Sequence, residues 1–369
     1  MISKTVDVDI IGDGIAGLAC VGALHQLGIP CRWLIDRDSA AGFSPQLVLN
    51  DVALSLLNDL FPGVDLSLGH RLDQRLVVWD SPNVDTIKQQ SLSIHQGQLR
   101  QVLSEYLAEH GIKPQRVDFN QMPQPGKWQI WTQRKPLAGF LDKTQINRHR
   151  LSSGERKIHA ASVKLSHHCQ KSSYVVESAD DGWMILIPHN LQQGTLQWCS
   201  PATTEPDDWL EQSKLIAPQI SRLNDERCFN VAPSIALPMC GQSDDGGWIV
   251  AGEQAANLDP ISGEGTPFSL RSAILAAAAI EAIRDKRIDA MDALLHYQSR
   301  ITKTFIEHLK GCLSYYNDSF GHHPNWQDEL ARTQFLIEQL ETVTQPDQWI
   351  EKYKMVDGRL IRINNKKGI

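Results

Sequence analysis

Apolar and polar positions in the first 36 residues predict a strand, a helix and a second strand. Residues 5–11 alternate and then run apolar into Gly12, which indicates a buried strand. Apolar residues then recur at helical spacing until Gly28, which closes the helix, and residues 31–35 indicate a strand ending at Asp36. This order predicts a βαβ unit, whose strands are normally parallel with a right-handed crossover.

The following segments continue this mixture of helices and strands. Residues 40–45 are predicted to form a loop, and residues 48–60 have the apolar spacing of a helix. Residues 76–79 predict a strand. Residues 98–110 carry leucine and valine on one side, which predicts an amphipathic helix closed by Gly111.

A β-rich block and a helical tail follow. Residues 248–251 predict a strand followed by glycine, a long helix is predicted over about 267–283, and residues 290–353 have mostly helical spacing. Between residues 127 and 203 the pattern predicts a sheet that covers another part of the molecule. Its short β-like runs are residues 128–132, 162–165, 174–176, 183–187 and 195–199.

Composition excludes several classes of protein. The 369 residues allow one large α/β unit or two packed domains, since a domain usually takes roughly 100–200 residues. Asp and Glu number 43 against 36 Lys and Arg, giving a net charge of −7 and no electrostatic footprint for nucleic acid or an anionic membrane. Hydrophobic residues make up 41% and charged ones 21%, which is ordinary globular composition and argues against disorder.

The cysteines and apolar stretches favour a reduced, cytoplasmic protein. The seven cysteines are scattered, with no CxxC pair, which argues against a disulfide framework or a zinc site. Asp7, Asp9 and Asp13 interrupt the apolar N-terminus, so we expect no signal peptide. Residues 274–283 are the most apolar later stretch, far shorter than the roughly 20 residues of a membrane span, so we expect no membrane partner.

The turn after the first predicted strand has the spacing of a dinucleotide site. Gly12, Gly14 and Gly17 form G-x-G-x-x-G between strand and helix. Gly12 would allow the tight turn, Gly14 the close approach of a pyrophosphate, and Gly17 close helix packing, with free N–H groups aimed at the anion. Asp36 would accept hydrogen bonds from the ribose hydroxyls. A glycine-rich turn of another α/β protein is the alternative, and the strand–turn–helix context favours the dinucleotide.

A second glycine-rich loop favours FAD over NAD. It lies immediately before the predicted alanine-rich helix, where glycine N–H groups and the positive end of a helix dipole would attract an anion. Two separated turns suit an extended ligand: the first would hold the adenosine pyrophosphate, and the second would face the flavin ring. The residues of this loop that carry the interpretation are Gly252, Glu253, Asp259, Pro260, Gly263, Glu264 and Gly265.

Both loops resemble motifs of the superfamily of FAD-dependent monooxygenases, geranylgeranyl reductases and tryptophan halogenases, over roughly residues 5–320. Residues 42–45, 78–81 and 183–188 are similar to further motifs of its halogenase-like members. Arg100 lies on the helix that usually supplies an arginine to the pyrophosphate, near but not in the usual register. The resemblance implies FAD bound by Gly12, Gly14, Ile15, Ala16, Gly17, Asp36, Arg37, Ser44, Arg100, Gly252, Glu253, Pro260, Gly263, Glu264 and Gly265.

The resemblance also implies the α/β fold of a group A flavoprotein monooxygenase. A Rossmann-like FAD-binding domain, residues 1–125 and 228–290, would be interleaved with a β-sheet substrate or partner domain, residues 126–227. Residues 291–369 would form a C-terminal helical region.

Within this superfamily the chain is most similar to the flavoprotein maturases of glycine oxidase and lysine oxidase. The features are its short length, the Val-Trp-Asp-Ser run and Tyr315-Tyr316. Such maturases help to convert a Trp and a Cys of a partner into cysteine tryptophylquinone. The resemblance implies an FAD-dependent oxidoreductase that hydroxylates a protein-bound tryptophan in the precursor of a quinone-containing amino-acid oxidase, using O2 and an external reductant. Two alternatives stay open: a small-molecule oxygenase, halogenase or reductase, and a flavin-binding assembly factor without turnover.

The chain departs from the halogenase pattern at the positions that bear on mechanism. Glu253 replaces the usual aspartate near the ribityl hydroxyls, and Ile185 stands where halogenases have the second Trp of a motif. The lysine that carries chlorine has no counterpart ahead of Trp79, where Arg71 and Arg75 occur. A protonated arginine cannot serve as that nucleophile.

The middle motif of the superfamily, D-G-x-x-S with a following arginine, is eroded. It is represented at best by residues 142–144 with Arg148 or Arg150, which weakens the case for ordinary NAD(P)H docking. The cofactor itself performs the chemistry of such enzymes, so the predicted catalytic positions are Asp259 and Pro260 of the flavin-facing loop. The histidine pairs 167–168 and 322–323 favour solvated loops over a metal site.

Overall fold

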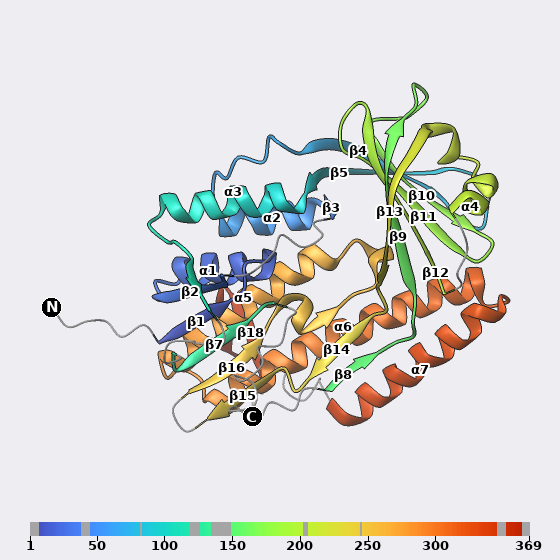
Figure 1. Cartoon of the computed structure of the whole chain (residues 1–369). Helices are drawn as coiled ribbons and strands as arrows, with labels where there is room; N and C mark the ends of the chain where they lie inside the picture. Colours follow the sequence, from blue (N-terminus) through green and yellow to red (C-terminus); the bar gives the residue numbers. More distant parts are fainter. Residues whose placement is uncertain are drawn as a thin grey trace.

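The structure is a computed structural model that describes residues 7–37, 45–81, 83–118, 126–133, 149–201, 206–243, 246–344 and 352–363. Two large sheets, joined by a small third sheet, are packed with helices (Figure 1). In Figure 1 the eight-stranded sheet lies at the upper right, and the six-stranded sheet lies at the lower left beside α1 and α5. This mixed α/β architecture with C-terminal helices is the predicted fold class.

The six-stranded sheet contains the predicted βαβ unit. Its order is β15-β16-β7-β1-β2-β6, and β1 pairs in parallel with both β2 and β7. Helix α1 (Ile15–Gln26) connects β1 to β2, which confirms the strand, helix and strand predicted from the first apolar runs. The strands are β1 (Val8–Ile11), β2 (Cys31–Asp36), β6 (Gln115–Val117), β7 (Trp128–Trp131), β15 (Cys240–Ser243) and β16 (Gly246–Val250).

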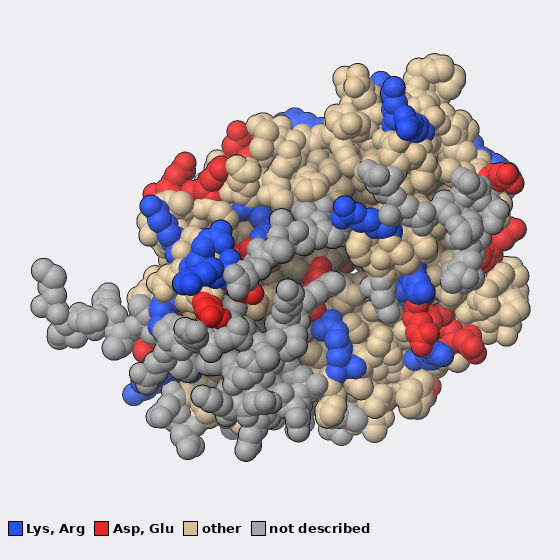
Figure 2. Space-filling model, in the orientation of Figure 1, with Lys and Arg blue, Asp and Glu red and all other residues tan. Residues whose placement is uncertain are grey.

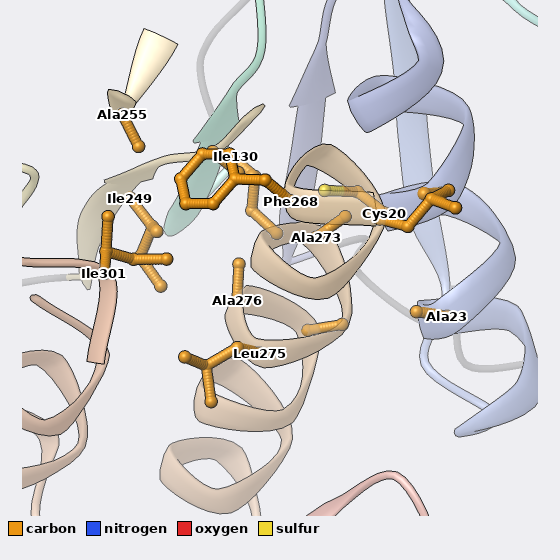
Figure 3. Close-up of a cluster of buried hydrophobic side chains, with 14 of the residues drawn as sticks. Cys20, Ala23, Ile130, Ile249, Ala255, Phe268, Ala273, Leu275, Ala276 and Ile301 are labelled. Atoms are coloured by element: carbon orange, nitrogen blue, oxygen red, sulfur yellow. The ribbon is translucent and has the colours of Figure 1, made fainter. Parts of the chain in front are cut away.

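Helix α5 (Gly265–Arg284) is the central helix of the half that contains the six-stranded sheet. Figure 3 shows it between α1, which carries Cys20 and Ala23, and α6, which carries Ile301. Its small alanine side chains, among them Ala273 and Ala276, are fully buried, and they let neighbouring helices approach closely. By length and composition α5 is long and apolar enough to cross a membrane. However, 78% of its most apolar 18-residue stretch is buried inside the protein, as in the core helix of a soluble protein.

The eight-stranded sheet forms the second half. Its order is β13-β9-β12-β11-β10-β4-β5-β3, in which β10 and β4 pair in parallel and the other neighbours are antiparallel. Helix α4 (Pro206–Gln212) and the 3₁₀ turn η3 (Ala217–Gln219) connect β12 to β13. The strands are β3 (Gln46–Leu49), β4 (His70–Val78), β5 (Asp85–His95), β9 (Lys157–Leu165), β10 (Ser173–Ala179), β11 (Gly182–Pro188), β12 (Gln193–Ser200) and β13 (Ile220–Asn230).

Strands from each of the two expected domains occur in both large sheets, so the sheets do not follow the expected domain boundaries. Strand β7, expected in the β-rich domain, belongs to the six-stranded sheet. Conversely, β3, β4 and β5 belong to the eight-stranded sheet, although they precede residue 125. A small sheet of β8 (His149–Ser152), β14 (Ser234–Leu237) and β17 (Ala256–Asn257) lies where the chain passes between the halves.

Helices α2 (Asp51–Leu60) and α3 (Gln96–Glu109) complete the half that contains the six-stranded sheet and correspond to two predicted helices. The first of them starts later than expected, at Asp51, because Val48 and Leu49 pair with β5 in strand β3. Asn50 caps α2, since its side chain accepts the N–H of Ala53 at 2.9 Å.

The C-terminal region is helical only in part. Helices α6 (Ala290–Phe320) and α7 (Pro324–Thr344) follow the prediction. Strands β18 (Tyr353–Val356) and β19 (Arg359–Arg362) form a hairpin where a helical region was expected. The chain turns at Asp357 and Gly358, whose φ values are 48° and 72°, and this Asp-Gly pair between two short runs favours a hairpin over a helix.

Candidate nucleotide and substrate site

The first glycine turn leaves open space for an anion at the start of α1. No heavy atom lies within 4 Å of the position that a Cβ of Gly14 would occupy. A Cβ at Gly17 would lie 2.4 Å from the carbonyl oxygen of Gly12, so this glycine is required for close packing. Gly12 itself has a φ of +123°. The first N–H groups of α1, at Ile15 and Ala16, have no partner within the helix and provide donors at this turn.

The two glycine loops meet although 240 residues separate them. Gly252 has a φ of +67°, and a Cβ there would lie 2.4 Å from the Cβ of Ala16. Its N–H donates to Ser272 Oγ at 2.9 Å, which ties the second loop to α5. The first turn of α1 and the second loop are therefore adjacent, so one extended ligand would be able to contact both.

Asp36 and Arg37 end the strand that flanks this turn. Asp36 is half-buried at the carboxyl end of β2, next to β1, and the exposed Arg37 donates its N–H to the carbonyl of Val117 at 3.0 Å. Asp36 thus lies at the edge where a ribose is expected. Ser44 lies outside the described residues.

Arg100 contacts the first glycine turn itself. From α3, its Nε donates to the carbonyl oxygen of Asp13 at 2.9 Å, and its guanidinium pairs with the Asp13 carboxylate. This pairing compensates the one acidic side chain of the turn, which would otherwise repel a pyrophosphate. Arg100 therefore lies at the predicted site, where it contacts Asp13 of the turn.

Arg150 holds the second loop from outside. Its two terminal nitrogens donate to the carbonyl oxygens of Glu253 and Gln254 at 2.8 and 3.2 Å, and its Nε donates to Ser234 Oγ at 2.8 Å. Glu253 is exposed within the short 3₁₀ turn η4 (Gly252–Gln254). The arginine considered for the middle motif thus shapes the loop; residues 142–144 and Arg148 lie outside the described residues.

The N-terminus of α5 is also open. Gly263 has a φ of +67°, and neither it nor Gly265 has an atom within 4 Å of its Cβ position. Glu264 does not cap the helix with its side chain. Instead its carboxylate accepts from Asn50 at 3.3 Å and pairs with Arg271 at 3.2 Å. The helix N–H groups at this turn are therefore available to a ligand.

The side chain of Asp259 is fully buried and anchors the loop. It accepts the N–H of Ile261 at 3.0 Å, at the start of the 3₁₀ turn η5 (Pro260–Ser262), and the hydroxyl of Tyr316 at 2.8 Å. Its backbone N–H donates to Nε2 of His308 at 2.8 Å. The carboxylate faces the protein interior, whereas Pro260 is half-buried at the start of η5. Asp259 thus positions the loop rather than contacting a substrate.

Arg156 is the main site residue that sequence reasoning missed. It is 2% exposed and pairs with Asp259 at 3.1 Å and with Glu329 of α7 at 3.4 Å. Its guanidinium also lies over the rings of Tyr316 and Trp326, 5.4 and 5.8 Å from their centroids. Burial opposes its charge, but the neighbouring carboxylates of Asp259 and Glu329 hold the pKa of Arg156 above its ordinary value. No local motif marks these residues, which converge from three distant segments.

A cavity of about 360 Å³ lies between the η5 loop and the eight-stranded sheet. Arg75 and Val176 line it from the sheet, Ile261 from the loop, and His308 and Tyr315 from α6. Burial lowers the pKa of His308, and because its Nε2 accepts the Asp259 N–H, the neutral ring carries its proton on Nδ1. The cavity is thus partly apolar beside the loop, and Arg75 of β4 and Glu307 of α6 add charged groups to its wall.

Of the two tryptophans in motif-like positions near this cavity, Trp183 is buried in the core and Trp79 is partly exposed. Trp183 is 1% exposed, and its Nε1 donates to Tyr316 Oη at 3.0 Å, so it packs the sheet and does not face a substrate. Trp79 is half-buried and stacks on Tyr315 with ring centroids 4.3 Å apart. Ile185 packs against the buried cluster of Val77, Tyr174 and Val176 on the sheet face that Ile261 contacts.

Within the described ranges, no group of three His, Cys, Asp or Glu side chains is arranged to hold a metal ion. The rings of His167 and His168 contact each other in an exposed turn. On the face shown in Figure 2, basic and acidic side chains are interspersed.

Comparisons with known proteins bear on the fold. No protein-family model and no curated protein matches the chain. It is similar to the solved structure of the peptidyl tryptophan dihydroxylase QhpG, essential for tryptophylquinone cofactor biogenesis, with a TM-score of 0.68, 19% identity, and coverage of 89% of this chain and 78% of that one. It is also similar to a triple mutant of the flavin-dependent brominase Bmp2, with a TM-score of 0.69, 16% identity, and coverage of 93% of this chain and 97% of that one. For the myxobacterial chondrochloren halogenase CndH the TM-score is 0.71 and the identity 11%, with coverage of 93% of this chain and 91% of that one. The chain therefore has the fold of FAD-dependent hydroxylases and halogenases.

Proposed function

We propose that this chain is an FAD-dependent monooxygenase that hydroxylates a protein-bound tryptophan during cysteine tryptophylquinone formation in a partner amino-acid oxidase. The observation that carries the flavoprotein assignment is the contact between the two glycine loops at Ala16 and Gly252. The likeness to a peptidyl tryptophan dihydroxylase supports the choice of a peptide tryptophan as substrate.

The residues present fit FAD. The open space at Gly14 and the free N–H groups of α1 suit the pyrophosphate, and Asp36 suits the adenosine ribose. The open N-terminus of α5 at Gly263 and Gly265 suits the electron-rich edge of the reduced ring. When bound, FAD supplies the reaction with dioxygen: one oxygen atom enters the indole ring, the other leaves as water, and an external reductant provides two electrons.

The protein contributes positioning and exclusion of water. Val176 and Ile261 give the cavity apolar walls suited to an indole, and the volume of about 360 Å³ accommodates one such ring. The buried pair of Arg156 and Asp259 fixes the η5 loop that forms one wall. Arg75 lines this cavity, and a permanently protonated guanidinium does not carry chlorine, which argues against halogenation.

Two further functions are distinguished by experiment. A small-molecule oxygenase, halogenase or reductase is favoured by the likeness to Bmp2 and CndH. An assembly factor without turnover is favoured by the burial of the Asp259 carboxylate, which keeps the predicted catalytic aspartate away from a substrate. We also propose a reducing, cytoplasmic location, which the seven free cysteines support.

The test begins with the purified protein. The proposal predicts a yellow protein that releases FAD on denaturation, and a colourless protein would contradict it and the oxygenase alternative together. The reduced protein is then mixed with oxygen and NADPH. Rapid NADPH oxidation that depends on a free indole favours a small-molecule enzyme, whereas turnover that requires the partner polypeptide supports the proposed maturase.

A further inference from the structure

A cavity of about 660 Å³ lies away from the site described above. It is formed where α1, α2, α5, α6 and the β18–β19 hairpin converge. Figure 3 shows three of the side chains that line it, Ala23 of α1, Leu275 of α5 and Ile301 of α6. Cavities of roughly 300–1,000 Å³ are the usual size of small-molecule sites.

The cavity has an apolar floor. Leu60, Leu275 and Ile301 are buried, and Leu27 and Leu56 are half-buried. These side chains come from three helices and from the C-cap of α1, so the apolar surface is concave and lacks the long stripe that a partner helix would require. Its shape suits a hydrocarbon or aromatic body of small-molecule size.

The rim of the cavity carries a cation without a carboxylate partner. Of its three arginines, Arg271 pairs with Glu264 at 3.2 Å and Arg359 with Glu281 at 3.6 Å. Arg300 is exposed and has no ion-pair partner in the part of the chain that the structure describes. The rim also includes Asp59 and Asp357, and because Glu264 and Glu281 already pair with Arg271 and Arg359, Arg300 is the rim arginine left for an anionic group.

We propose that this cavity binds a small amphiphile with a carboxylate head, which Arg300 pairs while the apolar body lies over Leu275 and Ile301. A guanidinium is the side chain best suited to a carboxylate, because its donors match both oxygens. The apolar floor accounts for the rest of the affinity through burial of the ligand's hydrocarbon. This site is independent of the substrate proposed above.

The cavity is connected to the second glycine loop. Ser272 lines the cavity, and its Oγ accepts the N–H of Gly252 at 2.9 Å. Arg271 also lines it and pairs with Glu264, directly before the open start of α5. A ligand that displaces either side chain changes the loop that faces the flavin, so occupancy alters flavin fluorescence.

The test is calorimetric titration of the flavin-loaded protein with sodium decanoate. We expect saturable binding, about tenfold weaker in Arg300→Gln, which removes the charged hydrogen bonds to the head group. Thr304→Trp, which adds bulk at an exposed lining position, should abolish binding without entering the core. Arg284→Gln is the matched control, because it removes an exposed arginine outside the cavity and should bind decanoate like the wild type.

Several outcomes overturn the proposal. Decanoate that gives no heat of binding, or that binds Arg300→Gln and Thr304→Trp like the wild type, rules out this site. Equal affinity for decyltrimethylammonium rules out the assignment of a carboxylate head. Concentration-dependent self-association that Thr304→Trp abolishes would assign the cavity to a second copy of the chain. Binding with unchanged flavin fluorescence overturns the coupling to the loop.

Discussion

Arg156 and Asp259 form a buried ion pair, 3.1 Å apart, that joins the eight-stranded sheet to the η5 loop. Arg156 directly precedes β9, and Asp259 directly precedes η5. Glu329 of α7 pairs with the other side of Arg156 and also accepts the N–H of Glu155 at 2.7 Å. One cation therefore fixes the positions of both halves and of the C-terminal helix around the loop.

Arg156→Met should destabilise the protein by about 3–5 kcal/mol, because it leaves Asp259 and Glu329 buried without a counter-charge. Urea denaturation followed by tryptophan fluorescence measures the free energy of unfolding. The control is Arg332→Met, which breaks an exposed pair with Glu155 and should cost less than about 1 kcal/mol. An equal loss of unfolding free energy in the two variants would show that the buried pair stabilises the protein no more than the exposed one.

His308 predicts a dependence of stability on pH. Burial lowers its pKa, an effect partly offset by Asp259 and Glu264 and reinforced by Arg156. Because the unfolded state then binds the proton more readily, stability present at pH 7 is lost as the pH falls from about 6.5 toward the lowered pKa.

The variant His308→Gln isolates this contribution, since the Gln carbonyl can still accept the N–H of Asp259. We expect its free energy of unfolding to fall less than that of the wild type between pH 7 and pH 5. His189, whose pKa burial lowers to about 4, titrates in both proteins and cancels in the comparison. Parallel pH profiles would exclude His308 as a titrating group in this range.

The first glycine turn could be predicted because its requirements are local. Gly12, Gly14 and Gly17 lie within six residues between one strand and one helix, so spacing alone determines their geometry. Asp259 was recognised as part of the loop, but the direction of its carboxylate depends on Arg156 and Tyr316, which lie 103 and 57 residues away. Such contacts follow from packing and leave no periodic signal in the chain.

Arg150→Met should weaken FAD retention roughly tenfold, because two charged hydrogen bonds to the carbonyls of Glu253 and Gln254 are lost. Equilibrium dialysis of the flavin measures the change. Ser234→Ala is the matched control: it removes only the contact with Arg150 Nε and should retain FAD within about twofold. If Arg150→Met holds FAD as tightly as Ser234→Ala, the second loop does not depend on this arginine.

Gly14→Asp should abolish FAD binding while preserving the fold. The Cβ position is open and the φ of −71° suits any residue, but the carboxylate would face the pyrophosphate. Far-ultraviolet circular dichroism reports the fold and the flavin absorption spectrum reports binding. Ser55→Asp adds the same charge at an exposed position of α2 and should stay yellow. Flavin retained in Gly14→Asp would mean that the first turn is misassigned.

The strands show where apolar patterns stop being informative. Strand β5 went unpredicted because its first half is exposed and polar, from Asp85 to Gln90, and only residues 91–94 are buried. The run 128–132 was correctly predicted as a strand, yet its sheet could not be known, since β7 pairs with β1 more than a hundred residues earlier. Strand pairing between distant segments is decided by the whole fold.

The central claim is tested most directly by the mass of the partner's tryptophan-bearing polypeptide. The chain is coexpressed with a candidate partner oxidase, and the partner is analysed by intact and peptide mass spectrometry, with Gly14→Asp as the flavin-free control. The account predicts that oxygen is added to a specific tryptophan only with the wild-type flavoprotein. An unchanged partner mass with a flavin-loaded wild-type protein would contradict it.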